Sequence, residues 1–243
     1  MAPRMLFVTA TDTEVGKTAV ASALAVLLRR RGWNVGVMKP IASGCDEAAG
    51  GLVSADGLCL AKAAGVDDPH ELICPIRLRH PLAPMAAAEL EGRTLDLSAI
   101  RSAVAELAAR HDSLIVEGIG GIMVPITADW TVLDLAAELA APVLVVARAG
   151  LGTINHSLLT VEALRSRGLG VAAVLLNSPA PSTGGLAEET NADVIARTSG
   201  APVIGPLAHC PGVCIETGEL AALPDALGRH DGTDALIADT FGT

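Results

Sequence analysis

Short apolar stretches alternate with helical patterns along most of the chain. The aliphatic stretches, typical of strands buried on both faces, are residues 5–10, 34–38, 114–116, 143–147, 171–176 and 203–207. Helical spacing of apolar positions occupies residues 17–31, 56–64, 84–91, 97–110, 132–139, 154–167 and 186–199. Strands that alternate with such helices form β-α-β units. The pattern therefore predicts an α/β fold with a mostly parallel β-sheet and helices on both faces.

The alternation continues to about residue 207 without a Ser- or Pro-rich linker. A chain of 243 residues can form one large domain or two small ones. The unbroken alternation favours a single domain over residues 1–243. Residues 41–54 are polar and rich in glycine, which predicts a loop. The pattern weakens after residue 207, where we expect a short helix or two.

Composition and charge argue against several classes of protein. Hydrophobic residues make up 51% of the chain and aromatic residues only 2%, so the core must be aliphatic. The formal net charge of −10 argues against a nucleic-acid partner, which needs basic clusters. No apolar run reaches the ~18 residues of a membrane span, and residues 1–8 lack the apolar core of a signal peptide. We expect a cytoplasmic protein with no membrane partner.

The chain has five cysteines, an odd number, and they are scattered, which fits a reducing compartment. Cys210 and Cys214 follow His209 and could suggest a metal site. Such a site needs three or four ligands, usually from two pairs of this kind, and the sequence has no second pair. We therefore expect no metal at this segment.

Polar residues follow the predicted strands, at the point where each strand ends. They are residues 11–18, Lys39, Glu117, residues 150–155 and Asn177. The carboxyl ends of parallel strands share one edge of a sheet, and ligands of such sheets bind there. We therefore expect these residues to gather in one site.

The turn after the first strand indicates a phosphate site. Gly16, Lys17 and Thr18 fit the end of the P-loop pattern G-x-x-x-x-G-K-[ST], although Thr11 occupies the first glycine position. In a P-loop the backbone N–H groups wrap the phosphates, the lysine reaches the β- and γ-phosphates, and the hydroxyl binds Mg²⁺. The N-terminus of the following helix adds a partial positive charge. The turn therefore predicts a nucleoside triphosphate site.

Three charged residues outside this turn are candidates for the same site. Glu117 ends a predicted strand, where P-loop enzymes hold the acid that meets Mg²⁺. Asp56 stands near a helix start, where an aspartate is usually a cap, so it is the weakest of the three. Lys39 follows a buried strand and is well placed to meet an anion.

Five segments together resemble the dethiobiotin synthetase family. They are "ATDTEVGKT" at residues 10–18, "KPIASG" at 39–44, "VEGIGG" at 116–121, "GLGTINHSLLT" at 150–160 and "LLN" at 175–177. They occur in the family's order and extend over most of the chain. Ala10 and Ile119 depart from the family's Gly and Ala, and Pro206 is the family's single match in "PLAHCPGV".

The resemblance implies an ATP-dependent ligase with Mg²⁺ as cofactor. In that family 7,8-diaminononanoate takes up CO₂ as a carbamate on one amine. The carbamate attacks the γ-phosphate of ATP and forms a carbamic-phosphoric anhydride. The second amine then closes the ureido ring, which leaves dethiobiotin, ADP and phosphate.

The resemblance also assigns residues. Lys17 and Lys39 are the catalytic lysines, at the γ-phosphate and the carbamate. ATP is expected at Glu14, Val15, Gly16, Lys17, Thr18, Glu117, Gly118, Gly120, Asn177, Pro206, Leu207 and Ala208. The diamine is expected at Thr13, Ser43, Gly152, Thr153 and Asn155, and Mg²⁺ at Thr18, Asp56 and Glu117. Residues 150–155 are expected to act from the neighbouring subunit of a homodimer.

Three alternatives stay open at this point. A regulatory or partitioning P-loop ATPase would carry an early lysine in the loop, where this chain has Asp12. A related amide-forming synthetase usually continues into a glutaminase domain, whereas this sequence stops at Thr243. The third alternative is a P-loop fold that has lost its activity.

Overall fold

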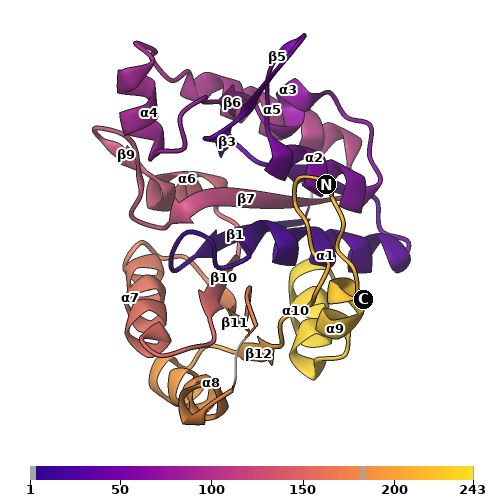
Figure 1. The fold of residues 1–243 in the computed structure, drawn as a ribbon, viewed down its shortest axis with the longest axis vertical. Coiled ribbons are helices and arrows are strands. Elements are labelled where there is room, and N and C mark those ends of the chain that lie inside the picture. The colour runs from indigo at the N-terminus through magenta and orange to yellow at the C-terminus, as the bar shows by residue number, and fades with distance from the viewer. Residues whose placement is uncertain (1–3, 182–183, 243) are drawn as a thin grey trace.

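A six-stranded sheet lies at the centre of the computed structural model, which describes residues 4–181 and 184–242 (Figure 1). Its strands are β1 (Arg4–Ala10), β2 (Val35–Met38), β7 (Ser113–Gly121), β10 (Val143–Arg148), β11 (Val171–Asn177) and β12 (Val203–Leu207). They lie in the order β12-β11-β10-β1-β7-β2, and every neighbouring pair is parallel. Each corresponds to one predicted strand, so the predicted parallel sheet is confirmed.

Helices cover both faces of this sheet because its strands alternate between two apolar clusters. Leu6 and Val8 of β1 pack into one cluster and Phe7 into the other. The first cluster includes residues of α1 (Lys17–Arg30), α2 (Ala55–Ala64), α9 (Leu223–Gly228) and α10 (Asp231–Phe241). The second includes residues of α4 (Pro84–Leu90), α5 (Leu97–Arg110), α6 (Val132–Leu139), α7 (Thr153–Ser166) and α8 (Leu186–Ser199). The predicted layers are confirmed, and α9 and α10 are the expected C-terminal helices.

Residues 41–54 are not the single loop that the sequence predicts. They contain β3 (Ile41–Ala42), β4 (Asp46–Ala48) and β5 (Gly51–Val53). β4 pairs with β5, and β3 pairs with β6 (Ile76–Arg77). The sequence pattern also missed α3 (His70–Ile73), β8 (Pro125–Thr127) and β9 (Trp130–Thr131). Elements of two to four residues show too little of a helical or strand period to be recognised.

The strand predicted at residues 114–116 continues much further, as β7. Glu117 therefore lies within a strand, opposite Val8 of β1, and the prediction that the strand ends at Glu117 is wrong. The glycines after Glu117 hid the continuation, because glycine is a weak strand former. Packing explains the glycine at position 118, because a Cβ there would lie 3.0 Å from Cζ of Phe7.

Within the described residues, no helix combines the length and the apolar character that crossing a membrane requires.

Candidate active site

The turn between β1 and α1 has the conformation of a phosphate-binding loop. Gly16 caps α1 with a left-handed φ of 89°, and no side chain caps the helix, which leaves its first N–H groups available. Glu14 also has a positive φ, of 55°. Ala10 is an extended strand residue paired with Val146, so the added methyl at this departure from the family pattern causes no backbone strain.

Asn177, the last residue of β11, ties this turn to the sheet. Its Nδ2 donates to the carbonyl of Val15 at 2.8 Å, and the side chain is buried. A Cβ on Gly16 would lie 2.3 Å from the same Nδ2, so glycine is required there for space as well as for its φ. Because Nδ2 makes this bond, the other amide atom, Oδ1, is left to act as a hydrogen-bond acceptor. Val15 itself lies behind the turn, buried.

Four charged and polar side chains, three from α1, α2 and β7 and one from the loop after β2, meet beside the phosphate loop. Nζ of Lys39 lies 2.5 Å from Oε1 of Glu117 and 2.8 Å from Oδ2 of Asp56. The Thr18 hydroxyl donates to the same Oε1 of Glu117 at 2.8 Å. One carboxylate oxygen thus joins the phosphate loop to the lysine after β2, and the structure brings together Thr18, Lys39 and Glu117, three of the residues expected to share one site.

Burial and neighbouring charges shift the pKa of the ionisable side chains in this site. Burial, assisted by the charge of Lys39, lowers the pKa of Lys17 to about 8. Burial alone would also lower the pKa of Lys39, but the carboxylates of Glu117 and Asp56 outweigh it and raise that pKa. Burial raises the pKa of Glu117 above its ordinary value. Lys39 is therefore held as a cation at neutral pH.

The oxygen atoms of this cluster fit a magnesium ion. Oε2 of Glu117 is buried without a hydrogen-bond partner among the described residues, which is costly unless something binds it. The Thr18 hydroxyl donates to the other oxygen of this carboxylate, and the Asp56 carboxylate interacts with the same hydroxyl. In the described part of the chain no three His, Cys, Asp or Glu side chains form a metal cluster. A Mg²⁺ site needs fewer such side chains, since the ion binds one or two carboxylates and completes its coordination shell with phosphates and water.

A cavity of about 540 Å³ opens over this cluster. The predicted site residues that line it are Thr13, Glu14, Gly16, Lys17, Thr18, Lys39, Ser43, Asp56, Glu117, Gly120 and Asn177. Ile119, where the family has a smaller residue, also lines it. The phosphate, metal and Ser43 positions predicted from separate segments thus share one cavity.

One part of the cavity wall was not predicted from the sequence. It is formed by Ser178, Pro179, His209, Cys210, Gly212, Val213, Ile215, Glu216 and Leu223. The predicted Pro206, Leu207 and Ala208 come just before this wall and do not line the cavity, and neither does Gly118. His209 is fixed by a 3.1 Å hydrogen bond between its Nδ1 and the carbonyl of Pro179. The sequence feature that could have indicated this wall is its position, since residues 209–216 follow β12, the last strand of the sheet.

The segment that carries Ser43 is bonded to residues 78–80. The N–H of Cys45 donates to the carbonyl of Leu78 at 3.0 Å, and that of Gly44 donates to the carbonyl of His80 at 3.3 Å. The position of Ser43 therefore depends on where this second segment lies.

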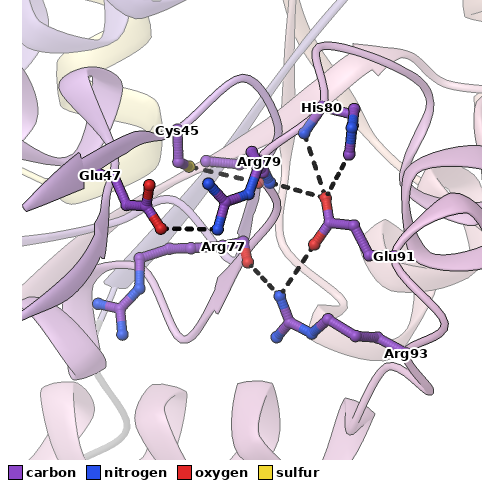
Figure 2. A network of polar contacts seen from close by, with 8 residues as sticks. Cys45, Glu47, Arg77, Arg79, His80, Glu91 and Arg93 are labelled. Atoms are coloured by element: carbon purple, nitrogen blue, oxygen red, sulfur yellow. Dashed lines mark hydrogen bonds and ion pairs between the residues drawn. The ribbon is translucent and has the colours of Figure 1, made fainter.

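Glu91, just after α4, holds that second segment in place (Figure 2). Its Oε1 accepts the backbone N–H groups of Arg79 and His80, at 2.8 and 3.2 Å. Arg93 reaches the other oxygen of Glu91 at 3.4 Å and the carbonyl of Arg77 at 2.7 Å. The Glu91 side chain is only 10% exposed, so most of this carboxylate is covered by its partners.

The predicted residues 152–155 do not line the cavity. Gly152 caps α7 with a φ of 91°, and the buried Thr153 faces Ser157. Asn155 is exposed, and Leu151 beside it is 94% exposed. This segment presents polar and apolar side chains to the surface of the protein, outside the cavity of its own chain.

Comparisons with known proteins place the chain in a family. The family described as "AAA domain" matches residues 4–214. An ATP-dependent dethiobiotin synthetase of Anaeromyxobacter dehalogenans is 52% identical over 178 residues, which cover 73% of this chain and 78% of the relative. Another, of an Anaeromyxobacter species, is 48% identical over 206 residues, 85% of this chain and 90% of the relative.

A solved structure shows the same fold. The MinC:MinD cell division protein complex of Aquifex aeolicus superposes with a TM-score of 0.59, covering 99% of this chain and 96% of that chain. At 14% identity this likeness shows the P-loop NTPase fold alone. The sequence relatives decide between the candidate classes: the chain belongs to the ATP-dependent dethiobiotin synthetases, ligases of biotin biosynthesis.

Proposed function

We propose that the chain converts 7,8-diaminononanoate, CO₂ and ATP into dethiobiotin, ADP and phosphate. One observation carries the proposal: Oε1 of Glu117 accepts from both the Thr18 hydroxyl and the Lys39 ammonium. The Glu117 carboxylate thus links the phosphate loop to a fixed cation, the Lys39 ammonium. A triphosphate and an anionic carbamate could meet there with their charges neutralised.

ATP would lie along the phosphate loop with its base toward Asn177. Lys17, at the N-terminus of α1, would reach the β- and γ-phosphates. Oδ1 of Asn177 would accept a hydrogen bond from the amino group of the base. Thr18, Asp56 and Glu117 would hold Mg²⁺, which when bound neutralises charge on the phosphates.

The diamine would lie at the Ser43 end, with Thr13 and Ser43 beside the amine that carries the carbamate. Lys39 would sit between the carbamate and the γ-phosphate and stabilise the charge of phosphoryl transfer. The transfer breaks the bond between the β–γ bridging oxygen and the γ-phosphorus, which releases ADP, and forms the carbamic-phosphoric anhydride. The second amine then attacks the carbamoyl carbon, expels phosphate and closes the ring.

The test is the substrate dependence of ADP release. We expect release to require both the diamine and bicarbonate, since the carbamate is the acceptor of the phosphoryl group. Equal release without the diamine would point instead to a nucleotide-hydrolysing switch of the partitioning class.

Glu117→Gln should raise the Mg²⁺ concentration for half-maximal activity more than Asp56→Asn does. Glu117 is fully buried and offers an unpartnered oxygen, whereas the Asp56 side chain is 34% exposed and water can replace part of its role. Titration of activity against Mg²⁺ in both variants measures this. An unchanged curve for Glu117→Gln would show that this residue is not a metal ligand.

Glu91→Ala should raise the diamine KM roughly tenfold and leave the ATP KM unchanged. The substitution removes two backbone hydrogen bonds to a charged acceptor, each worth ~1.5–3 kcal/mol, and frees the segment against which Ser43 is placed. The matched control is Glu47→Ala, whose carboxylate pairs with the Arg79 side chain at 2.7 Å and touches no backbone of this segment. Equal effects of both variants, or an ATP KM that rises as much, would contradict this role of Glu91.

A further inference from the structure

The N-terminus of α2 is closed by a side chain from another helix. Ser54 caps α2, and its Oγ accepts the N–H of Gly57 at 3.1 Å. In a capping box the residue at the position of Gly57 would be Glu or Gln, and its side chain would accept the N–H of the cap residue. Gly57 has no such side chain. Instead, Nε2 of His70, in α3, accepts the N–H of Ser54 at 3.1 Å.

Gly57 also makes room for the imidazole. A Cβ at this position would lie 3.2 Å from Cε1 of His70 and 3.4 Å from Cβ of Cys74, closer than most such contacts. The His70 imidazole therefore occupies space that is open because Gly57 has no side chain. α2 has no reciprocal cap from its own side chains, and His70 of α3 accepts the N–H of Ser54 in its place.

The bond to Ser54 fixes the tautomer of His70. Because Nε2 accepts, the proton of the neutral ring is on Nδ1. Nδ1 is buried and has no hydrogen-bond partner among the described residues, which counts against keeping a histidine there for stability alone. Burial, with the charge of Arg77, lowers the pKa of His70 and keeps the ring neutral, as an acceptor must be.

The same short helix holds the catalytic lysine. The carbonyl of Ile73 accepts the backbone N–H of Lys39 at 2.7 Å. Asp56 lies two residues after Ser54 and pairs with Nζ of Lys39 at 2.8 Å. Ser54 and Asp56 line the cavity, whereas His70 does not. α3 thus fixes both partners of this ion pair from behind, one through its C-terminal carbonyl and one through His70.

We propose that His70 is a positioning residue, which completes the cap of α2 in trans and so holds Asp56 against Lys39 and Thr18. The proposal rests on the proposed metal role of Asp56. It assigns His70 no contact with substrate, nucleotide or metal, and it predicts that the accepting atom, rather than the bulk of the ring, carries the effect.

His70→Phe and His70→Gln separate these two properties. Phenylalanine keeps a ring of similar shape without an acceptor, and glutamine can place an oxygen near the position of Nε2. The probe is the rise in melting temperature that Mg²⁺ causes in the presence of ADP. We expect His70→Phe to need roughly tenfold more Mg²⁺ for half of this rise, His70→Gln to stay within about twofold of the wild type, and the exposed Glu71→Gln to match it. A normal Mg²⁺ response in His70→Phe would overturn the proposal.

A second readout needs no variant that might fail to fold. The ¹⁵N chemical shifts of His70 in the intact protein report which nitrogen carries the proton. We expect the neutral ring with its proton on Nδ1, and a proton on Nε2 would overturn the proposal. Both readouts are independent of turnover. Loss of ring closure with these readouts as expected would contradict the proposed function, and normal turnover with a contrary tautomer would contradict the role of His70.

Discussion

Lys39→Ala should lower kcat about 10²–10³-fold, the usual loss when one donor to transition-state charge is removed. Its ATP KM should change little, because Lys39 pairs with Asp56 and Glu117 and is not part of the phosphate loop. Lys17→Ala should lower kcat by a similar factor and also weaken ATP binding, since Lys17 begins α1 at the phosphates. Steady-state kinetics with each substrate varied in turn measures both effects.

Lys62→Ala is the matched control for these two variants. Lys62 belongs to α2 and donates to the carbonyl of Thr217 at the surface, so its loss should leave both kinetic constants near the wild-type values. Equal losses of ATP affinity in Lys17→Ala and Lys39→Ala would contradict the division of roles between the two lysines.

Lys39→Ala should also destabilise the protein. It leaves the fully buried Glu117 carboxylate without its cation, a change that costs ~3–5 kcal/mol in comparable buried pairs. Mg²⁺ with ADP should recover part of this loss, because the ion would neutralise the same carboxylate. Thermal unfolding with and without Mg²⁺ and ADP measures the recovery, and kinetics should be recorded only where the variant is folded.

Asn155→Ala should raise the diamine KM roughly tenfold and leave the ATP KM nearly unchanged. We expect Asn155 to bind the substrate carboxylate with a charge-assisted hydrogen bond, worth ~1.5–3 kcal/mol. The side chain is exposed and outside the cavity of its own chain, so the account requires a neighbouring subunit to present it. Exposed apolar side chains nearby, Leu151 at 94% and Leu159 at 62%, fit a surface that is covered in a homodimer.

A mixture of two impaired variants, assayed at a diamine concentration well below the KM of Asn155→Ala, tests the shared site directly. Lys17→Ala and Asn155→Ala chains should recover activity when mixed, because one site of each mixed dimer receives both wild-type residues. Recovery should follow the formation of mixed dimers over time. An active monomer in sedimentation, or mixed dimers without recovery, would contradict the shared site.

The parts of the site that the sequence predicted are those with long, regular neighbours. β1 and α1 are strongly patterned, so the turn that carries Lys17 and Thr18 was located between them. Lys39 was found because it directly follows β2. Asn177 was found as the end of β11. In each case the prediction was possible because the residue follows or ends a recognisable strand, and the residue type alone would not have been enough.

The parts that were missed depend on contacts between distant segments. The position of Glu117 within β7 follows from pairing with β1 across a register shift, which single-sequence patterns do not show. The wall at residues 209–216 lacks any strand or helix period. The bond from His70 to Ser54 joins residues 16 positions apart, in helices of which one has only four residues. No local pattern specifies such a pairing.

The central claim, that this cavity closes a cyclic urea with carbon from CO₂, is tested most directly by isotope labelling. The protein would be incubated with ATP, Mg²⁺, 7,8-diaminononanoate and ¹³C-bicarbonate, and the products analysed by mass spectrometry and ¹³C NMR. The account predicts dethiobiotin with the label at the ureido carbon, formed in equal amount to the ADP released. ADP release without labelled dethiobiotin would contradict it.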